Sequence, residues 1–398
     1  MVRSRFRLYP TAGQAAALET HCGHARFVWN LAVKQQSWYR PWRGSALGYH
    51  EPSRQLTDAR KGSPWLAAGS RTVQQQALRD FSAAMANFFA GKHRRPGFRK
   101  RGRSEGFRIV GARGRQWDVR QVHRRWSEVK VPKVGWVRFR RSRAVPDAKS
   151  FRITRDRAGR WHVAFAAIPE SIDPSGTCEV VGVDRGVAVS AAFSIGEPLS
   201  CPGLRPAEVE RLRRPQRRLA RAGRRSNRRA RLRGRIARLK AREADRRKDW
   251  AERTSTELAR RYDLVRVEDL RLPNMIRSAR GTVAEPGRNV AQKASLNRSI
   301  LAAGWGLLVA RPEQKAPGRV EKIPAAYTSQ RYPACGHVAV ESRRSQARFR
   351  CVACGFESNA DVNAAIDITA GRAVTARGGG PLGQPVNREP QHFAPPSW

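Results

Sequence analysis

The chain has 398 residues, enough for two or three domains, and its hydrophobic fraction of 40% supports a folded protein. Lys and Arg number 79 against 32 Asp and Glu, giving a net charge of +47 that would repel itself in a compact fold without a bound polyanion. The sequence has no long apolar run, no signal-peptide core and no paired disulfide framework, which excludes a membrane-spanning or disulfide-rich secreted protein and favours the cytoplasm.

Nucleic acid is the polyanion that such a charge predicts, and binding should depend strongly on salt. The chain prefers Arg to Lys, which a GC-rich genome alone can produce. That bias only exchanges one cation for another, however, and leaves the deficit of acidic residues unexplained.

The first part of the chain predicts a strand followed by helices. Residues 5–9 alternate in strand fashion, and Thr11 and Gln14 have the spacing of a capping box that opens a helix. Residues 71–90 predict another helix with its large apolar side chains on one face, which core packing explains. The basic segment 91–104 is a loop that contacts phosphates or, alternatively, a solvated surface turn.

The middle of the chain is mostly strand from 107 to 170, with a hairpin turn at 156–160 and a domain boundary at 174–176. Residues 205–250 then predict a helical hairpin with a thin apolar seam and a broad cationic face. Between positions 211 and 248 it has 19 Lys or Arg among 38 residues, against two acids. Residues 271–300 are polar and broken, and we expect them to be mobile.

Three carboxylates stand out because of their place in the predicted elements. One short buried strand ends at Asp184, another ends in Glu268, and Asp361 follows the helix cap Asn359. Carboxylates on rigid strand ends can hold the Mg²⁺ ions that assist phosphodiester hydrolysis. Each could instead be an ordinary turn, cap or helix-dipole residue. Asp269 is excluded, because strand alternation points it to the opposite face from Glu268.

These carboxylates lie in segments that resemble the RuvC motifs of the TnpB (OrfB) family, nucleases encoded by bacterial insertion sequences. The motif segments are GVDRG at 182–186, VEDL at 267–270 and NADVNAA at 359–365. Further similar segments are RLYPTAGQ at 7–14, ARFVWNLAV at 25–33, RRPGFRKRGR at 94–103 and YTSQ at 327–330. The resemblance covers roughly residues 1–370 and is also shared with the miniature type V CRISPR effectors.

The resemblance implies an α/β multidomain fold with an RNase H-like (RuvC) nuclease domain. It implies that Asp184, Glu268 and Asp361 form a catalytic triad binding two Mg²⁺ ions, and that a guide RNA from the transposon end directs cleavage of DNA in a bacterial cytoplasm. The implied divisions are a wedge β-barrel (1–45 and 105–172), a helical recognition insert (46–104), a RuvC-like domain (178–325) containing the basic hairpin, a zinc-ribbon-like insert (326–358), a third-motif helix (359–372) and a disordered tail (373–398).

The implied zinc ribbon departs from the family pattern of paired C-x-x-C motifs. Cys351 and Cys354 keep one pair, Cys335 is half of the other, and Tyr332 stands where its partner is expected. Structural zinc is usually held by four thiolate or imidazole ligands, and neutral tyrosine is a poor replacement. Either His337 is the fourth ligand, or three cysteines and water bind zinc weakly, or the ribbon is metal-free; we expect weaker zinc retention than in a four-cysteine ribbon.

The leading functional hypothesis is an RNA-guided DNA endonuclease of an insertion sequence, a class traditionally called transposase. The alternative is a nuclease-impaired relic that binds RNA and DNA without cutting, which the degenerate ribbon favours and the intact triad opposes. A transposase that joins strands directly ranks last, because the motifs do not resemble the tyrosine- or serine-based enzymes of these elements.

Overall fold

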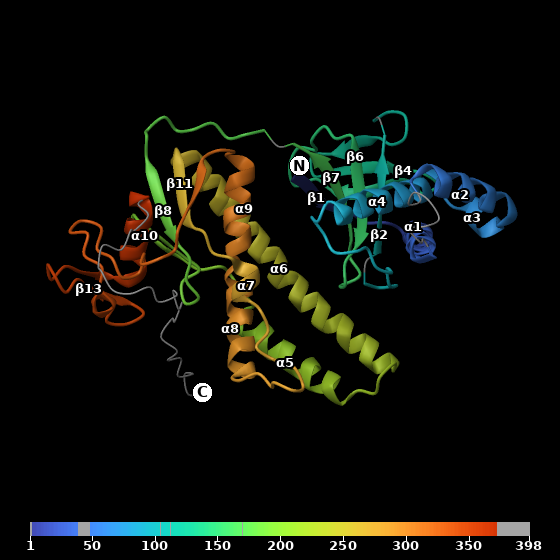
Figure 1. Ribbon diagram of the computed structural model, residues 1–398. Helices are drawn as coiled ribbons and strands as arrows, with labels where there is room; N and C mark the ends of the chain where they lie inside the picture. The colour runs from blue at the N-terminus through green and yellow to red at the C-terminus, as the bar shows by residue number, and fades with distance from the viewer. Residues whose placement is uncertain (1, 39–47, 104, 112, 169, 372–398) are drawn as a thin grey trace.

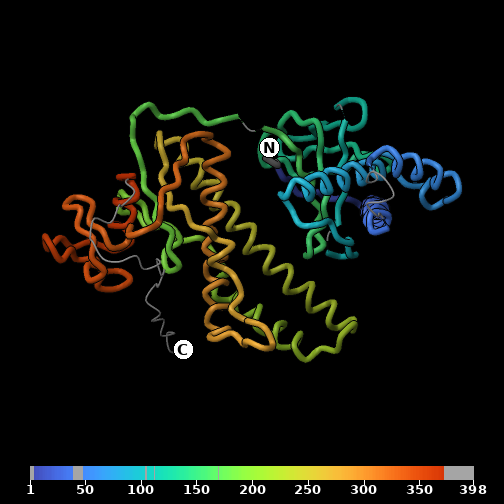
Figure 2. The backbone as a smooth tube through the Cα atoms, in the orientation of Figure 1, coloured from blue at the N-terminus to red at the C-terminus, as the bar shows by residue number. Residues whose placement is uncertain are grey.

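The computed structural model describes residues 2–38, 48–103, 105–111, 113–168 and 170–371, arranged as two lobes joined by an extended segment (Figure 1). The predicted tail at 373–398 lies outside the described residues. The backbone trace in Figure 2 crosses once between the lobes along this segment. The main chain of Ile172 on this segment is hydrogen-bonded to the second lobe. Its N–H donates to Lys315 O at 2.7 Å, and its carbonyl oxygen accepts from Arg319 Nη2 at 2.6 Å.

The first lobe combines two antiparallel sheets with helices. One sheet has the order β1-β7-β6-β2 and the other β3-β4-β5, and an isolated bridge between Leu8 and Phe139 joins them. The strands are β1 (Val2–Arg7), β2 (Glu105–Val110), β3 (Val119–His123), β4 (Trp126–Val131), β5 (Gly135–Arg140), β6 (Ser150–Arg155) and β7 (Trp161–Ala167). The predicted hairpin turn is confirmed between β6 and β7, where Asp156 accepts from the backbone N–H groups of Ala158 and Arg160.

Helices α1 (Ala12–Trp38), α2 (His50–Gly62), α3 (Pro64–Ala68) and α4 (Arg71–Phe89) complete this lobe. The capping box is confirmed, because Thr11 N–H donates to Gln14 Oε1 (3.1 Å) and Gln14 N–H to Thr11 Oγ1 (3.3 Å). Phe81 and Met85 of the predicted helix 71–90 are buried in the same core as the strand residues. Residues of the expected insert therefore share one core with the expected barrel.

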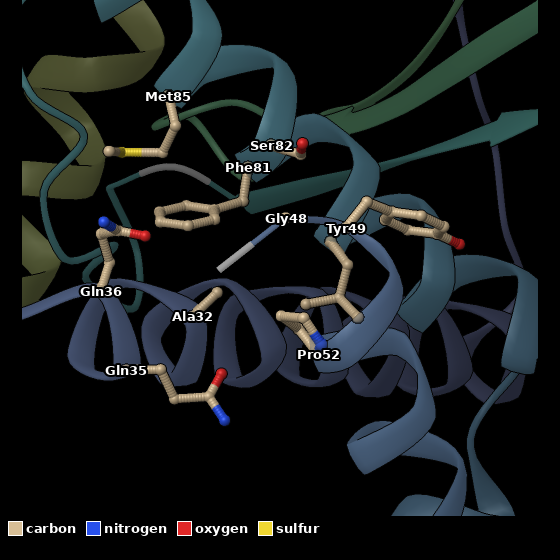
Figure 3. A pocket seen from close by; sticks show the side chains of 10 residues that line it. Ala32, Gln35, Gln36, Gly48, Tyr49, Pro52, Phe81, Ser82 and Met85 are labelled. Atoms are coloured by element: carbon tan, nitrogen blue, oxygen red, sulfur yellow. The ribbon is translucent and has the colours of Figure 1, made fainter. Parts of the chain in front are cut away.

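A small cavity of about 40 Å³ lies between α1, α4 and the segment at 48–52. Phe81 and Met85 face Ala32 and Gln36 across it (Figure 3). A cavity of this size holds little more than a water molecule, so it offers no site for a nucleotide base.

The second lobe is built on a sheet with the order β10-β9-β8-β11-β12. Its strands are β8 (Val180–Asp184), β9 (Ala191–Phe193), β10 (Pro198–Leu199), β11 (Leu264–Glu268) and β12 (Val320–Ile323). The strands β8, β11 and β12 run parallel, whereas β9 and β10 are antiparallel to their neighbours. The carboxyl ends of β8 and β11 therefore meet at one edge.

Helices cover both faces of this sheet (Figure 1). Helix α10 (Ala360–Ala370) lies on one face, and α6 (Asn227–Arg261) and α9 (Trp305–Lys315) lie on the other. The remaining helices of this lobe are α5 (Pro206–Arg221), α7 (Leu272–Met275) and α8 (Val290–Ala303). A ribbon with a short 3₁₀ turn at Val340–Ser342 and the strands β13 (Arg348–Arg350) and β14 (Glu357–Asn359) precedes α10. The basic hairpin is present as α5 and α6, but its second helix continues to Arg261 rather than ending at 250.

The expectation that residues 271–300 are broken and mobile was wrong for its second half. Helix α8 begins at Val290, and Ile300 and Ala303 are buried against Trp305, with Leu296 packed beside them. These apolar residues have helical spacing but are separated by polar ones, so the stripe is thin. Packing against Trp305 and the apolar residues of 270–276 makes this segment helical although its composition is polar.

Candidate metal-dependent nuclease site

The register of β8 and β11 places the first two carboxylates side by side. Val181 pairs with Val265 and Val183 with Val267, and all four valines are buried beneath α6 and α9. Because side chains alternate along a strand, Asp184 and Glu268 lie on the opposite face. Both residues end their strands, so the carboxylates lie at the same edge of the sheet.

Gly182 allows the third carboxylate to approach. A Cβ atom on Gly182 would lie 2.0 Å from the carbonyl oxygen of Ala365 and 2.4 Å from Thr369 Oγ1, both on α10. Arg266, opposite Gly182 on β11, also donates to the main-chain carbonyl of Thr369. Helix α10 therefore rests directly on this face and carries Asp361 at its beginning.

Helix α10 starts at the cap that the sequence predicted. Asn359 Oδ1 accepts from the backbone N–H of Asp361 at 2.9 Å and from that of Val362 at 3.3 Å. The Asp361 carboxylate points toward the sheet edge, since its Oδ2 lies 3.8 Å from where a Cβ atom on Gly186 would be. Three acids far apart in the sequence thus gather at one end of β8.

Mutual repulsion and burial oppose the charged form of this cluster. Burial, reinforced by the neighbouring Glu268 and Asp361, raises the pKa of Asp184 to about 8. Burial also raises the pKa of Asp361, although Arg343, whose Nη2 lies 3.6 Å from Asp361 Oδ1, acts in the opposite direction. A divalent cation would relieve the repulsion, so the electrostatics fit a metal site.

Two residues that sequence reasoning missed fix Glu268. Thr328 Oγ1 donates to Glu268 Oε1 at 2.7 Å, and both side chains are buried. Arg185, also buried, donates to the main-chain carbonyl of Glu268. Each lies in a segment that the family resemblance already singled out, YTSQ and GVDRG, but neither segment by itself indicates a contact with Glu268.

Asp269 lies outside the cluster, as strand alternation suggested. It is exposed, and its backbone N–H donates to Ile323 O on β12 at 2.7 Å. Its carboxylate is chemically equal to that of Glu268 and adjacent in sequence, so it is a natural control for substitutions in the cluster.

The donor set fits Mg²⁺, which prefers hard oxygen ligands and needs few of them from the protein. Three possible metal ligands form a compact group when one ligand atom from each residue lies within 4.8 Å of those of the other two. Among the described residues, Asp184, Glu268 and Asp361 do not form such a group.

The described residues that do meet that spacing are Cys335, Cys351 and Cys354. Their soft thiol ligands suit zinc. His337 is not part of the group, so the hypothesis that it supplies a fourth ligand is not supported by this arrangement.

Two basic features lie outside the carboxylate cluster. The arginine-rich hairpin of α5 and α6 extends from the sheet (Figure 1). A groove of about 830 Å³ lies between the lobes; its basic lining residues are Arg143 from the first lobe and Arg253, Arg260, Arg261, Arg311 and Lys315 from the second. Glu252 and Glu257 are its acidic lining residues, so positive charge dominates.

The basic loop near 94–103 is held against α1. Trp29 Nε1 donates to Gly97 O at 3.0 Å, and Asn30 both donates to Arg99 O and accepts from Arg99 N–H. The Arg99 guanidinium also lies 3.5 Å from the centre of the Trp29 ring. Two of the family-like segments therefore form one structural unit.

No helix among the described residues is long and apolar enough to cross a membrane.

Comparison with known families gives matches along most of the chain. Residues 166–279 match a family model described as a probable transposase of the OrfB type found in IS605 elements. Residues 305–368 match a Cas12f1-like TNB domain. Residues 2–42 match a helix-turn-helix domain, although the described residues of this segment form strand β1 and the single helix α1.

Whole-length relatives extend these matches. The Escherichia coli K12 protein named "Putative RNA-guided DNA endonuclease InsQ" is 34% identical over 394 residues, covering 97% of this chain and 96% of the relative. A Streptomyces pristinaespiralis protein with the same name, without "InsQ", is 30% identical over 94% of this chain and 90% of the relative. Among solved structures, the cryo-EM structure of a CRISPR-Cas12f ternary complex is 16% identical with a TM-score of 0.32, covering 88% of this chain and 80% of that one.

Proposed function

Because the chain belongs to the OrfB family of probable transposases, we propose that it is an RNA-guided DNA endonuclease of an insertion sequence, with Asp184, Glu268 and Asp361 as its metal-binding catalytic residues. The observation that carries this proposal is the convergence of these carboxylates. Two strands and a helix from distant parts of the sequence bring them to one sheet edge. The names of the whole-length relatives support the activity.

The sheet supports an RNase H-like, RuvC-type domain. An antiparallel run of β8, β9 and β10 followed by parallel β11 and β12, giving the order β10-β9-β8-β11-β12, is the arrangement expected of such a domain. It accounts for the catalytic positions, since β8 and β11 are central neighbours whose carboxyl ends face α10.

The chemistry divides between the carboxylates and the residues that hold them. When bound, Mg²⁺ would supply charge neutralisation at the attacking and leaving oxygens of a phosphodiester. Asp184, Glu268 and Asp361 would hold it, and Thr328 keeps Glu268 in one orientation. Arg343 reaches the cluster from the ribbon and balances part of the charge of Asp361.

The nucleic-acid partners follow from the charge and the relatives. We infer a guide RNA from the transposon end and a DNA target, held by the hairpin of α5 and α6 and by the groove between the lobes. Sequencing of the RNA that copurifies with the protein tests this: a discrete RNA ending in a variable segment supports a guide, and random cellular RNA contradicts it.

A binder that no longer cuts is the second candidate, favoured by the replacement of a zinc ligand by Tyr332. Cleavage and binding must therefore be measured separately. The purified ribonucleoprotein with Mg²⁺ and matched target DNA should cut, which the second candidate does not predict.

Asp184→Asn should abolish cleavage while target binding persists, because the amide keeps the shape of the side chain but removes the charge. Asp269→Asn is the matched control, since Asp269 is an exposed acid beside Glu268 and should leave cleavage unchanged. Cleavage by Asp184→Asn at the wild-type rate would remove these residues from the active site.

A further inference from the structure

The ribbon before α10 contains two turns with the same backbone hydrogen bonds. In one, Cys351 N–H donates to Phe356 O (2.9 Å) and Gly355 N–H to Cys351 O (2.9 Å). In the other, Tyr332 N–H donates to His337 O (3.1 Å) and Gly336 N–H to Tyr332 O (2.9 Å). Tyr332 therefore occupies the structural position of Cys351, and Cys335 that of Cys354.

Both turns depend on a glycine at the same position. Gly336 has φ = 71° and Gly355 has φ = 75°, in the left-handed region that other residues rarely adopt. The turn with Tyr332 thus keeps the backbone of a metal-binding turn although its first ligand is missing. The replacement has not unfolded the turn, so another interaction must stabilise it.

The remaining thiols keep the spacing of a metal site. The Sγ atoms of Cys335, Cys351 and Cys354 all lie within 4.8 Å of one another, and those of Cys335 and Cys351 are 3.5 Å apart. Two sulfurs on a tetrahedral zinc ion would be about 3.8 Å apart for Zn–S bonds of about 2.3 Å. The cluster can therefore accept a zinc ion with little movement.

The Tyr332 ring is used for packing. It stacks on Phe356 with ring centres 4.2 Å apart and an interplanar angle of 12°, and it lies 6.5 Å from the Phe349 ring. Phe349, Cys351 and Ala360 form the small buried core against which it packs. Aromatic pairs of this kind contribute about 0.5–1.5 kcal/mol beyond the area they bury.

We propose that the stacked pair of Tyr332 and Phe356 replaces the fourth zinc ligand as the support of the ribbon, which leaves a three-thiolate metal site with an open fourth position. A metal bound there would complete its shell with water or a small exogenous ligand. The ribbon would fold without metal, and zinc would bind reversibly to a ready-made site.

The position of Asp361 depends on this ribbon. Strand β13 pairs with β14 so that Arg348 lies opposite Asn359, and Ala360 N–H donates to Ala347 O at 3.1 Å. Asn359 is also the cap of α10. An aromatic pair that keeps the ribbon folded therefore keeps the start of α10 in place in the absence of metal.

Metal affinity distinguishes the open site from alternatives. The zinc affinity of the purified full-length protein can be measured by competition with a chromophoric chelator. Tyr332→Cys should bind zinc at least ~100-fold more tightly than wild type. This change is larger than the ~10–100-fold loss of metal affinity that follows when a residue hydrogen-bonded to a metal ligand is removed. Tyr332→Phe should bind zinc like wild type. A loss of zinc affinity in Tyr332→Phe would make the phenol oxygen a ligand and overturn the proposal.

Cobalt gives a spectroscopic count of the thiolates. With Co²⁺ in place of zinc, the intensity of the thiolate-to-cobalt charge-transfer band increases with the number of thiolate ligands. Wild type and Tyr332→Phe should therefore show about three quarters of the intensity of Tyr332→Cys, because they have three thiolates and it has four. Absorption of wild type typical of four thiolates would contradict an open position. Wild type and Tyr332→Phe decide this point even if Tyr332→Cys folds poorly.

Limited proteolysis tests the support of the ribbon. In the presence of a chelator, the wild-type ribbon should stay resistant, whereas Tyr332→Ala and Phe356→Ala should be cut within 326–358. Val340→Ala is the control, because Val340 lies in the same ribbon with 66% of its surface exposed. A wild-type ribbon that is cut as soon as metal is removed would show that metal, not the aromatic pair, holds it.

Discussion

At the scale of single residues, the site is a set of charges that the fold holds together against their repulsion. Burial raises the pKa of both Asp184 and Asp361, and the neighbouring Glu268 and Asp361 carboxylates add to this effect at Asp184. Their supports are short-range and specific, namely Thr328 on Glu268 and Arg343 near Asp361. These supports come from the segment that joins the sheet to the ribbon and from the ribbon itself.

Thr328→Val should raise the Mg²⁺ concentration needed for half-maximal cleavage by about 10-fold or more, with target binding unchanged. Valine has nearly the same shape but cannot donate to Glu268 Oε1, so the carboxylate loses its fixed orientation. Loss of a residue that orients a metal ligand typically reduces metal affinity or activity by ~10–100-fold. The measurement is a Mg²⁺ titration of cleavage rate.

Thr328→Ser provides the rescue control, because serine keeps the hydroxyl donor and should behave nearly like wild type. If valine and serine at position 328 gave the same Mg²⁺ dependence as threonine, the hydrogen bond would have no part in positioning Glu268. A fall in stability in Thr328→Ser alone would instead point to packing of the threonine methyl group, which valine keeps.

At the scale of elements, the carboxylates are placed by the fit of α10 against β8. Gly182 is the closest approach in this contact, with no room for a Cβ atom below Ala365 O. The buried valines on the other face fix the orientation of β8, so the strand cannot rotate to make room. A side chain at position 182 would therefore push α10, and Asp361 with it, away from the strand.

Gly182→Ala should destabilise the protein by about 1–3 kcal/mol or more, the usual range for overpacking, and should reduce cleavage by displacing α10. The free energy of unfolding from denaturant titration and the cleavage rate are the two measurements. Gly203→Ala is the control, because a Cβ atom there would have no heavy atom within 4 Å. Equal stability of both variants would show that α10 does not rest on Gly182.

The strand ends and the cap were the features that the sequence alone could indicate. The apolar runs before Asp184 and Glu268 predicted buried strands, and the structure has both. Asn359 predicted the start of α10, and its hydrogen bond to Asp361 N–H confirms the cap. Thr328 could not be assigned a role, because its contact with Glu268 spans 60 residues and depends on how the chain returns to the sheet.

Helix α8 shows the same limit at the level of elements. Its buried residues Ile300 and Ala303 are too few to produce a strong helical pattern among the polar residues around them. The surface that makes the helix stable comes from other parts of the chain, namely Trp305 and the apolar residues of 270–276. Local sequence therefore predicted the strands β8 and β11 better than the helix α8.

At the scale of the whole molecule, the two lobes face each other across a groove whose charged lining residues are mostly basic. An ion pair between Arg160 of the first lobe and Asp245 on α6 (2.6 Å) connects them beside the groove. The groove has Arg143 on one wall, and Arg253, Arg260 and Arg261 follow α6 on the other. A net charge of +47 is tolerable in this arrangement when a nucleic-acid backbone lies between the lobes.

Replacement of Arg253, Arg260 and Arg261 by Gln should weaken target binding by the guide-loaded protein and make it less dependent on salt. Each arginine that contacts a phosphate should lower the slope of log K against log salt by about 0.7–0.9, because fewer counterions are released on binding. The control replaces three exposed arginines of the first lobe, Arg115, Arg124 and Arg125, and so removes the same charge elsewhere. A groove that holds nucleic acid predicts a smaller slope for the groove variant than for the control. Equal slopes would mean that only net charge matters and that the backbone lies elsewhere.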